Sequence, residues 1–268
     1  MKITRRWLLS SLVVATALLL AACSTVVPRV DAEARRALVP SGTLRVGVYP
    51  GSPTSMIVEA KTGQKIGIAH DLGRELALQF GVPFEVVEFR RVAEVLDALK
   101  VGAVDFTFTN ATAVRAKDMD FTAPLLQLEL GYIVPSGSRI SAISDIDQPG
   151  VRVGVSEGSS SQGTLSKQFK SATIIPAPAL KAAREMLSQG KLDTFATNKA
   201  VLFELADELP GSRLLDGRWG LENMAIAVPK GRERGMLALR EFAEQAKSSG
   251  LLQSIVGRTG LRGSVKAE

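Results

Sequence analysis

The sequence predicts an α/β protein of two similarly built lobes, each with a mostly parallel sheet flanked by helices. The first observation is that strand-like and helix-like segments alternate along the chain. The second is an internal repeat, because two segments occur twice in the same order. LRVGVYPGS (44–52) matches VRVGVSEGS (151–159), and GAVDFTFTN (102–110) matches GKLDTFATN (190–198). Two copies of one unit predict two lobes that face each other across a cleft, with two hinge crossings between them.

The first copy of the unit has a clear order of elements. Its strands alternate apolar residues with polar or small ones, and its helices carry an apolar stripe at helical spacing. Glycine follows each helix, as is typical of a helix end. The expected elements are a strand through Val46 and Val48, a helix over 71–80, a strand over 84–89, a helix over 92–99 and a strand over 104–108.

The second copy repeats this order, with a helix at LKAAREMLSQG (180–190) and a strand at LDTFAT (192–197). A strand at MAIAVPKG (224–231) and a helix over 232–248 follow, and we expect them to return the chain to the first lobe. The expected division is lobe 1 at 43–130, lobe 2 at 131–222, a return to lobe 1 at 223–258 and a tail at 259–268, with the crossings near 131–134 and 222–228.

The N-terminus has the layout of a secretory signal, with basic residues that include Arg5 and Arg6 before an apolar run. Cys23, the only cysteine, directly follows Leu-Ala-Ala, and this pattern resembles the bacterial lipobox, in which the cysteine is lipidated. We predict a signal peptide at 1–22, lipidation of Cys23 and a polar tether at 23–42. Arg5-Arg6 also resembles a twin-arginine export signal. The alternative is a chance cysteine in a signal peptide that is cut elsewhere.

Composition and charge exclude several classes of function. With 46% hydrophobic and 22% charged residues, the chain has an ordinary globular balance. Its net charge of +6 falls to about +3 without the three basic residues of the signal, which leaves 30 basic residues against 27 acidic ones. This charge is too weak and too scattered for nucleic-acid binding. One histidine, His70, and one cysteine predict no metal site, and we expect no cofactor.

Five segments in order resemble the family 3 bacterial extracellular solute-binding proteins: LRVGV, GIAHDLGRELALQFGV, the strand into TNATAVRAKDMDFTAP, VRVGVSEGSS and GKLDTFATN. The resemblance covers about residues 43–257. It implies a type II periplasmic-binding-protein-like fold and the role of amino-acid-binding component of an ABC importer, not of an enzyme. It also implies a monomer in the periplasm or cell envelope, here lipid-anchored to a membrane, with a membrane permease as partner.

In this family, the arginine in the place of Arg115 holds the α-carboxylate of the ligand. A guanidinium matches a carboxylate with two parallel charge-assisted hydrogen bonds. We expect Thr112 to cap a helix that begins there, which leaves backbone N–H groups aimed at an anion. Asn110 ends the preceding strand and is expected at the same cleft. The alternative is that Arg115 pairs with Asp118 or Asp120 on the surface.

Ser159 and Ser160 belong to a glycine-serine turn that follows a strand of the opposite lobe. Such a turn offers N–H groups and hydroxyls to the same carboxylate. The family carries small hydroxylated residues here, so both serines are expected ligand contacts. The alternative is a flexible serine turn without a ligand.

Three contacts usual in the amino-acid binders are missing from this sequence. Asn198 stands where an aspartate usually neutralises the ammonium of the ligand. Ser52 and Ser55 stand where aromatic residues usually pack on the ligand, and Ala69 stands where an acidic residue is usual. We keep Asn198 and Ser52 among the expected site residues, with a strand-end turn as the alternative for Asn198.

These departures leave three explanations open. Another acid, such as Glu157 or Glu222, serves the amine of the ligand, because a buried ammonium without a carboxylate is costly. Alternatively, the ligand is a carboxylate without an α-amine. In the third explanation, this member has lost tight binding of simple amino acids.

Two other functions fit the same fold. Some prephenate or arogenate dehydratases resemble it and use a cleft carboxylate as acid or base, for which Glu157 is the candidate. A ligand-responsive sensor that feeds no transporter is the other. His70 is expected to be a helix-surface or packing residue. Asp105 and Asp193 share a repeat position and are expected to mark strand edges or helix contacts rather than catalysis.

Overall fold

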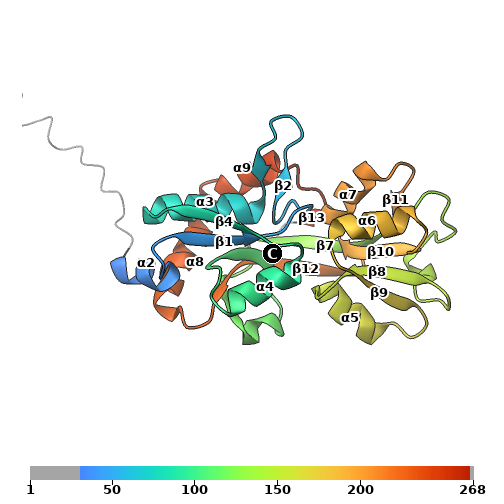
Figure 1. The fold of residues 1–268 in the computed structure, drawn as a ribbon, viewed down its shortest axis with the longest axis horizontal. Coiled ribbons are helices and arrows are strands. Elements are labelled where there is room, and N and C mark those ends of the chain that lie inside the picture. The colour runs from blue at the N-terminus through green and yellow to red at the C-terminus, as the bar shows by residue number, and fades with distance from the viewer. Residues whose placement is uncertain (1–30, 266–268) are drawn as a thin grey trace, which may run out of the picture.

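The computed structural model describes residues 31–265. It shows two α/β lobes side by side, joined by strands that run between them (Figure 1). This arrangement confirms the predicted fold class. The predicted signal peptide at 1–22, the Arg5-Arg6 pair and the lipidation site at Cys23 lie outside the described residues. Within the described part of the chain, no helix has both the length and the apolar character needed to span a membrane.

Lobe 1 is a small sheet covered by helices. Its main elements are β1 (Leu44–Val48), α3 (Ile68–Phe80), β4 (Phe84–Glu88), α4 (Val92–Lys100), β5 (Thr107–Asn110) and α8 (Glu233–Ser248). β1 and β4 are parallel, and a bridge joins Val46 to Phe106 just before β5. The apolar stripes that predicted these helices are buried, as Leu72 of α3 and Leu239 of α8 show. The helices therefore form because each buries one face on the sheet.

Lobe 2 has the same construction. Its main elements are β8 (Arg152–Ser156), α5 (Ser160–Gln168), β9 (Thr173–Ala177), α6 (Leu180–Ser188), β10 (Thr194–Asn198) and α7 (Lys199–Glu208). β8 lies between β9 and β10 and is parallel to both. Buried side chains cover both faces of this sheet, with Phe195 in one cluster and Val153 in another. The helices on the two faces account for the nearly continuous apolar strands.

Two long antiparallel strands connect the lobes. They are β7 (Leu126–Val134) and β12 (Gly220–Pro229). β12 pairs with β5 of lobe 1 and with β7, and β7 in turn pairs with β10 of lobe 2. One continuous sheet therefore runs through both lobes (Figure 1). The expected crossings near 131–134 and 222–228 fall on these two strands.

The remaining described elements are short or peripheral. They are α2 (Ala32–Leu38), β2 (Ile57–Val58), β3 (Lys65–Ile66), η1 (Arg115–Lys117), β6 (Met119–Phe121), η2 (Ile143–Asp145), β11 (Arg213–Leu214), α9 (Leu251–Arg258) and β13 (Ser264–Val265).

Both ends of the described chain are more ordered than the sequence indicated. The expected tether includes α2, whose Leu38 is buried against Gly235 of α8. The expected tail includes β13, which pairs with β7 in the register Ser264↔Leu128. Arg262, just before β13, forms ion pairs with Glu204 and Asp207 of α7. The C-terminal segment therefore touches the connecting strand β7 and lobe 2.

The internal repeat has a structural counterpart in an arginine–aspartate pair. In lobe 1, Arg45 of β1 binds Asp105 through its backbone N–H and its guanidinium. In lobe 2, Arg152 of β8 binds Asp193 in the same way. Each pair fastens the first strand of a lobe to the segment that precedes a neighbouring strand. Asp105 and Asp193 are therefore structural contacts, as expected.

Candidate functional site

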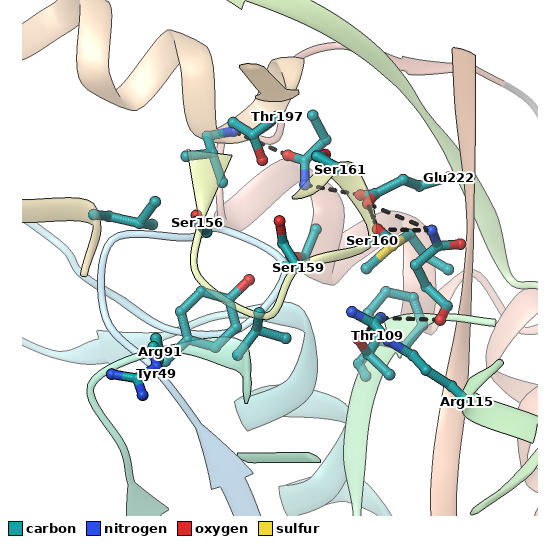
Figure 2. A pocket seen from close by; sticks show the side chains of 18 of the residues that line it. Tyr49, Arg91, Thr109, Arg115, Ser156, Ser159, Ser160, Ser161, Thr197 and Glu222 are labelled. Carbon is teal, nitrogen blue, oxygen red and sulfur yellow. Dashed lines mark hydrogen bonds between the residues drawn. The ribbon is translucent and has the colours of Figure 1, made fainter. Parts of the chain in front are cut away.

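A cavity lies between the lobes, at the ends of β5 and β10 and beside the connecting strand β12 (Figure 2). Ligands of open α/β sheets bind in this place, outside the carboxyl ends of the strands. The main lining residues from lobe 1 are Tyr49, Thr54, Phe108, Thr109, Asn110 and Arg115; those from lobe 2 are Ser159, Ser160, Leu180, Thr197, Asn198 and Val201; and β12 adds Glu222 and Met224.

Arg115 points into this cavity from the short turn η1. Its Nη1 donates to Thr109 Oγ1 at 2.8 Å and to the carbonyl of Asn110 at 3.1 Å. Nε and Nη2 make no hydrogen bond within residues 31–265. These two atoms form the side of the guanidinium that can receive a carboxylate with two parallel hydrogen bonds. The geometry therefore holds the arginine in place and leaves its binding edge free.

The surface alternative for Arg115 disagrees with the structure. Asp118 pairs with Lys100 at 3.0 Å, and Asp120 pairs with Lys230 at 2.5 Å. Among the described residues, Arg115 has no carboxylate within salt-bridge distance. Burial lowers the pKa of Arg115, and the charges of Glu222 and Tyr49 oppose that shift. A guanidinium nevertheless stays charged in proteins, so the cavity contains a fixed positive charge.

Glu222 is the carboxylate of the cavity. It lies on β12 with 6% of its surface exposed. Its Oε1 accepts from Ser160 Oγ at 2.8 Å and from Asn110 Nδ2 at 3.4 Å, and its Oε2 accepts from Asn198 Nδ2 at 2.9 Å. All three donors are neutral, and no described cation lies within salt-bridge distance. Glu222 was one of the two acids that the sequence offered as an amine partner.

Glu157, the other of these two acids, lies outside the cavity. Its side chain is 47% exposed and pairs with Arg91 across the two lobes at 3.4 Å. Arg91 lines the edge of the cavity and also pairs with Glu94 at 3.1 Å. Glu157 therefore belongs to a rim contact between the lobes, and Glu222 is the acid available to a bound molecule.

Asn110 and Asn198 hold Glu222 from opposite lobes. Asn198 caps α7 by accepting the N–H of Val201 at 3.1 Å, while its Nδ2 faces Glu222. Asn110 accepts the N–H of Asn223 at 3.0 Å. The alternative for Asn198 was a residue that only ends a strand. Its side chain does lie at a strand end, where it caps α7, but it also binds the carboxylate of Glu222.

The serine turn of lobe 2 reaches the cavity as expected. Ser159 is the N-cap of α5 and accepts the N–H of Gln162 at 3.1 Å. Ser160 Oγ accepts from Asn110 Nδ2 at 3.2 Å and so links lobe 2 to lobe 1. Thr112 accepts the N–H of Arg115 at 3.2 Å but does not line the cavity. The helix predicted after Thr112 is only the three-residue turn η1, which is too short to form an N-terminal anion site.

Ser52, an expected ligand contact, does not line the cavity, whereas Tyr49 does. Ser52 has no exposed surface, its Oγ lies 2.9 Å from Thr54 Oγ1, and it does not line the cavity. Ser55 Oγ accepts the N–H of Tyr49 at 2.8 Å and so holds the loop behind the aromatic ring. Burial raises the pKa of the Tyr49 phenol, which stays neutral. The position of Tyr49 directly after β1 is the signal that could have identified it.

Other titratable groups that the sequence singled out lie away from the cavity lining. His70 is buried and its Nδ1 lies 2.8 Å from Asp71 Oδ1, so it is a packing residue. Asp105 binds Arg45 and Arg232 inside lobe 1. Within the described residues, no group of three or more metal-binding side chains is present.

The fold and this cavity define a two-lobed α/β protein with a candidate binding site where the lobes meet, and a family comparison identifies its class. Residues 44–259 match the bacterial extracellular solute-binding proteins, family 3. The chain belongs to this family.

Individual relatives are distant but extend over most of the chain. The chain is 23% identical to the ABC transporter glutamine-binding protein GlnH of Bacillus subtilis (strain 168) over 198 residues, which cover 72% of each protein. It is similar to the solute receptor for L-cysteine of Neisseria gonorrhoeae, with a TM-score of 0.75, 23% identity, and coverage of 85% of this chain and 92% of that one.

A third relative is an ancestral amino-acid-binding protein, AncCDT-1, described as a precursor of cyclohexadienyl dehydratase. The TM-score is 0.71 with 24% identity, over 82% of this chain and 96% of that one. At such identities, the similarity to solved structures shows the fold. One curated relative is named as a glutamine-binding protein of an ABC transporter, and another, from Dichelobacter nodosus, as an amino-acid-binding protein.

Proposed function

We propose that this chain is the substrate-binding component of an ABC importer and binds a small carboxylate-bearing solute, an amino acid or a related molecule. The observation that carries the proposal is the free edge of Arg115 inside a cavity lined by both lobes. Ser159 and Ser160 supply hydroxyls from the opposite lobe. Thr112, Asn110 and Asn198 support the site by positioning Arg115 and Glu222.

Closure of the lobes on the ligand is the proposed mechanism. In this structure the lobes already touch, through Asn110 and Ser160 at 3.2 Å and through Arg91 and Glu157 at 3.4 Å. A solute that contacts both lobes interacts fully only with the closed state, so it shifts the population toward that state. β7 and β12 are the two strands across which the lobes would rotate. A permease would recognise the closed form.

The location and the partners are part of the same proposal. A signal peptide at 1–22 would direct export, and a lipid on Cys23 would hold the mature monomer at a membrane in the periplasm or cell envelope. Labelling cells with a radioactive or clickable fatty acid tests the anchor. Incorporation that is lost in Cys23→Ser supports lipidation, and unlabelled protein in the wild type rejects it.

Binding can be tested directly by isothermal titration calorimetry with the amino acids and with small carboxylates that lack an amine. We expect at least one of them to bind, and Arg115→Ala to weaken it by about 30-fold or more, because the charge-assisted pair is buried. Arg240→Ala, on the exposed face of α8, is the matched control and should bind as the wild type does. Unchanged affinity in Arg115→Ala would show that Arg115 does not bind the carboxylate of the ligand.

Catalysis is the second candidate function, and the buried Glu222 is the observation that favours testing it. A dehydratase needs a cleft carboxylate as acid or base, and Glu222 rather than Glu157 occupies the cleft. We propose binding without turnover. Incubation with prephenate and with arogenate should leave both substrates unchanged beyond the enzyme-free rate. Turnover by the wild type that is lost in Glu222→Gln would show that the protein is an enzyme and would overturn the proposal of binding without turnover.

A sensor that feeds no transporter predicts a different cellular result. If the chain serves an importer, deletion of its gene should lower uptake of the ligand found by calorimetry. Unchanged uptake, together with retained binding, would favour the sensor.

A further inference from the structure

The cavity contains one available positive charge and one available negative charge. Its charged lining residues within the described chain are Arg91, Arg115 and Glu222. Arg91 is engaged by Glu94 and Glu157 at the rim. Arg115 and Glu222 have no oppositely charged partner within salt-bridge distance in the described part of the chain. The two free charges therefore balance each other without forming an ion pair.

Glu222 has acceptor capacity left. An ionised carboxylate has about four lone-pair sites. Ser160 and Asn110 donate to Oε1, whereas Asn198 alone donates to Oε2. One acceptor position on Oε2 thus stays open. Three neutral donors hold the group in place but do not neutralise it, and a buried carboxylate without a cation is costly.

We propose that the ligand is a neutral, zwitterionic α-amino acid whose ammonium group binds Glu222 while its carboxylate binds the free edge of Arg115. This inference rests on the proposed function. A zwitterion supplies one charge of each sign and leaves none over. A ligand without an amine leaves Glu222 unpaired, and a ligand without a carboxylate leaves Arg115 unpaired.

The same charge balance limits the side chain of the ligand. The other cavity residues include Leu180, Val201, Met224 and the neutral Tyr49. None of them can neutralise an additional ammonium, guanidinium or carboxylate, and Arg91, the remaining charged residue of the lining, is already paired with Glu94 and Glu157. A lysine, arginine, aspartate or glutamate ligand would bury an unmatched charge, which is costly. The site therefore selects amino acids with uncharged side chains.

Asn198 and Glu222 are hydrogen-bonded to each other, and one is an amide while the other is an acid. The acid stands on β12, and the amide stands at the start of α7. Asn198 Nδ2 and Glu222 Oε2 are 2.9 Å apart. Two carboxylates at that distance would repel each other. The amide at 198 is thus the matching partner of an acid at 222 and does not mean that the amine site is lost.

A calorimetric screen tests the ligand class. The probes are L-alanine, L-serine, L-valine, L-glutamine, L-lysine, L-arginine, L-glutamate, L-aspartate, the desamino analogues propionate and isovalerate, and the carboxylate-free L-alaninamide. We expect binding only among the first four or among other neutral amino acids. Preferential binding of a charged amino acid, or binding of a desamino acid as tight as that of its amino acid, would overturn the inference.

An exchange of the two side chains tests the role of Glu222. Glu222→Gln should weaken the best neutral ligand by about 30-fold or more. The double variant Glu222→Gln with Asn198→Asp should recover at least about a tenth of the wild-type affinity, since it returns one acid and one amide to the pair. Glu85→Gln, an exposed residue of β4, is the matched control and should bind as the wild type does.

The outcomes separate this inference from the proposed function. Ligand-free melting temperatures within a few degrees of the wild type show that the variants are folded. If amino-acid binding is undiminished in folded Glu222→Gln, the amine site lies elsewhere and the inference fails. If a desamino acid binds through Arg115 and no amino acid binds, the proposed function stands and the inference fails. If no probe binds, the proposed function itself fails.

Discussion

Asp71 is a buried carboxylate near the start of α3, with no exposed surface and with partners from two helices. His70 Nδ1 lies 2.8 Å from Oδ1, and Arg258 of α9 donates to Oδ2 at 2.7 Å. Burial by itself raises the pKa of Asp71, but the hydrogen bond from His70 and the charge of Arg258 together hold the pKa below its ordinary value. The ionised carboxylate therefore stabilises the folded chain.

Replacement of Asp71 by asparagine should lower the free energy of unfolding by about 2 kcal/mol near neutral pH. Because the pKa is lower in the folded chain than in the unfolded chain, this stabilisation is present above the unfolded pKa and is lost as the pH falls through the folded one. The wild type and Asp71→Asn should thus converge as the pH falls from about 5 to 2. Urea unfolding at a series of pH values measures the difference.

The exposed Asp216→Asn is the control for this series and should track the wild type at every pH. A difference between wild type and Asp71→Asn that is constant over the acidic range would show that the ionised form of Asp71 is not the stabilising one.

Sequence reasoning identified individual site residues when a local motif carried them. Arg115, Ser159 and Ser160 were predicted from short patterns, and all three line the cavity. Glu222 was only one of two candidates, because its surroundings come from positions 110, 160 and 198, which are remote in the sequence. Tyr49 was missed because the loop after β1 was aligned to place Ser52 in the cavity.

At the scale of elements, the two arginine–aspartate pairs have the same pattern but different surroundings. Asp105 is fully buried and binds both Arg45 and Arg232, which also donates to the carbonyl of Leu38. Among residues 31–265, Asp193 binds Arg152 alone, and its side chain is 32% exposed. The first pair therefore joins β1 and the segment before β5 to α2 and α8, whereas the second joins only β8 and the segment before β10.

Because of this difference, we expect replacement of the aspartate by alanine to destabilise the protein more at position 105 than at the repeat-related position 193. Asp105→Ala should lower the free energy of unfolding by about 3–5 kcal/mol, since two arginines lose a buried partner. Asp193→Ala should cost about 1 kcal/mol, because a half-exposed pair is partly replaced by water. Urea denaturation compares the two variants, each serving as the control for the other. Equal losses would contradict the view that burial sets the cost.

Elements with a long apolar stripe were predictable, and short elements were not. The helix expected over 232–248 is α8, and the residues of its apolar stripe are all buried: Met236, Leu239, Phe242, Ala243 and Ala246. α2 was placed in a tether because its segment of the sequence has few apolar residues, and in the structure only Ala34 and Leu38 of its seven residues are buried. β13 has two residues and exists through pairing with β7, so no local pattern signals it.

At the scale of the whole molecule, the lobes meet closely along the cleft. Gly158 of lobe 2 faces Ala93 of α4, and a Cβ added at Gly158 would lie 2.5 Å from the Cβ of Ala93. Gly51 and Leu180 also face each other at the other side of the cleft. The arrangement of the lobes in this structure thus places a glycine at each of these two contacts.

Replacement of Ala93 by leucine should hold the lobes apart. A larger side chain at a close contact costs about 1–3 kcal/mol, so the closed state should lose population and ligand affinity should fall about 5- to 100-fold. Small-angle scattering should show a larger radius of gyration with the ligand present. Ala93→Ser is the matched control and should close normally. Full closure and full affinity in Ala93→Leu would mean that the contact between Ala93 and Gly158 does not limit closure of the lobes.

The overall architecture was predictable because the repeat encodes it twice. LRVGV and VRVGV became β1 and β8, and the two later repeat segments became β5 and β10. The joining of both lobes into one continuous sheet was not predictable, since it depends on long-range pairing of β7 with β12 and β10. The ligand cavity itself depends on that joining.

The two ends of the described chain lie at very different places in the fold. α2 packs on α8 at the outer end of lobe 1, away from lobe 2 (Figure 1). β13 instead lies on β7, one of the two strands that connect the lobes. Attachment of the protein to a biosensor chip through its N-terminal side would leave lobe 2 free to swing. A fluorescent reporter fused after β13 would sit beside this connecting strand, where its emission would report the proposed opening and closing.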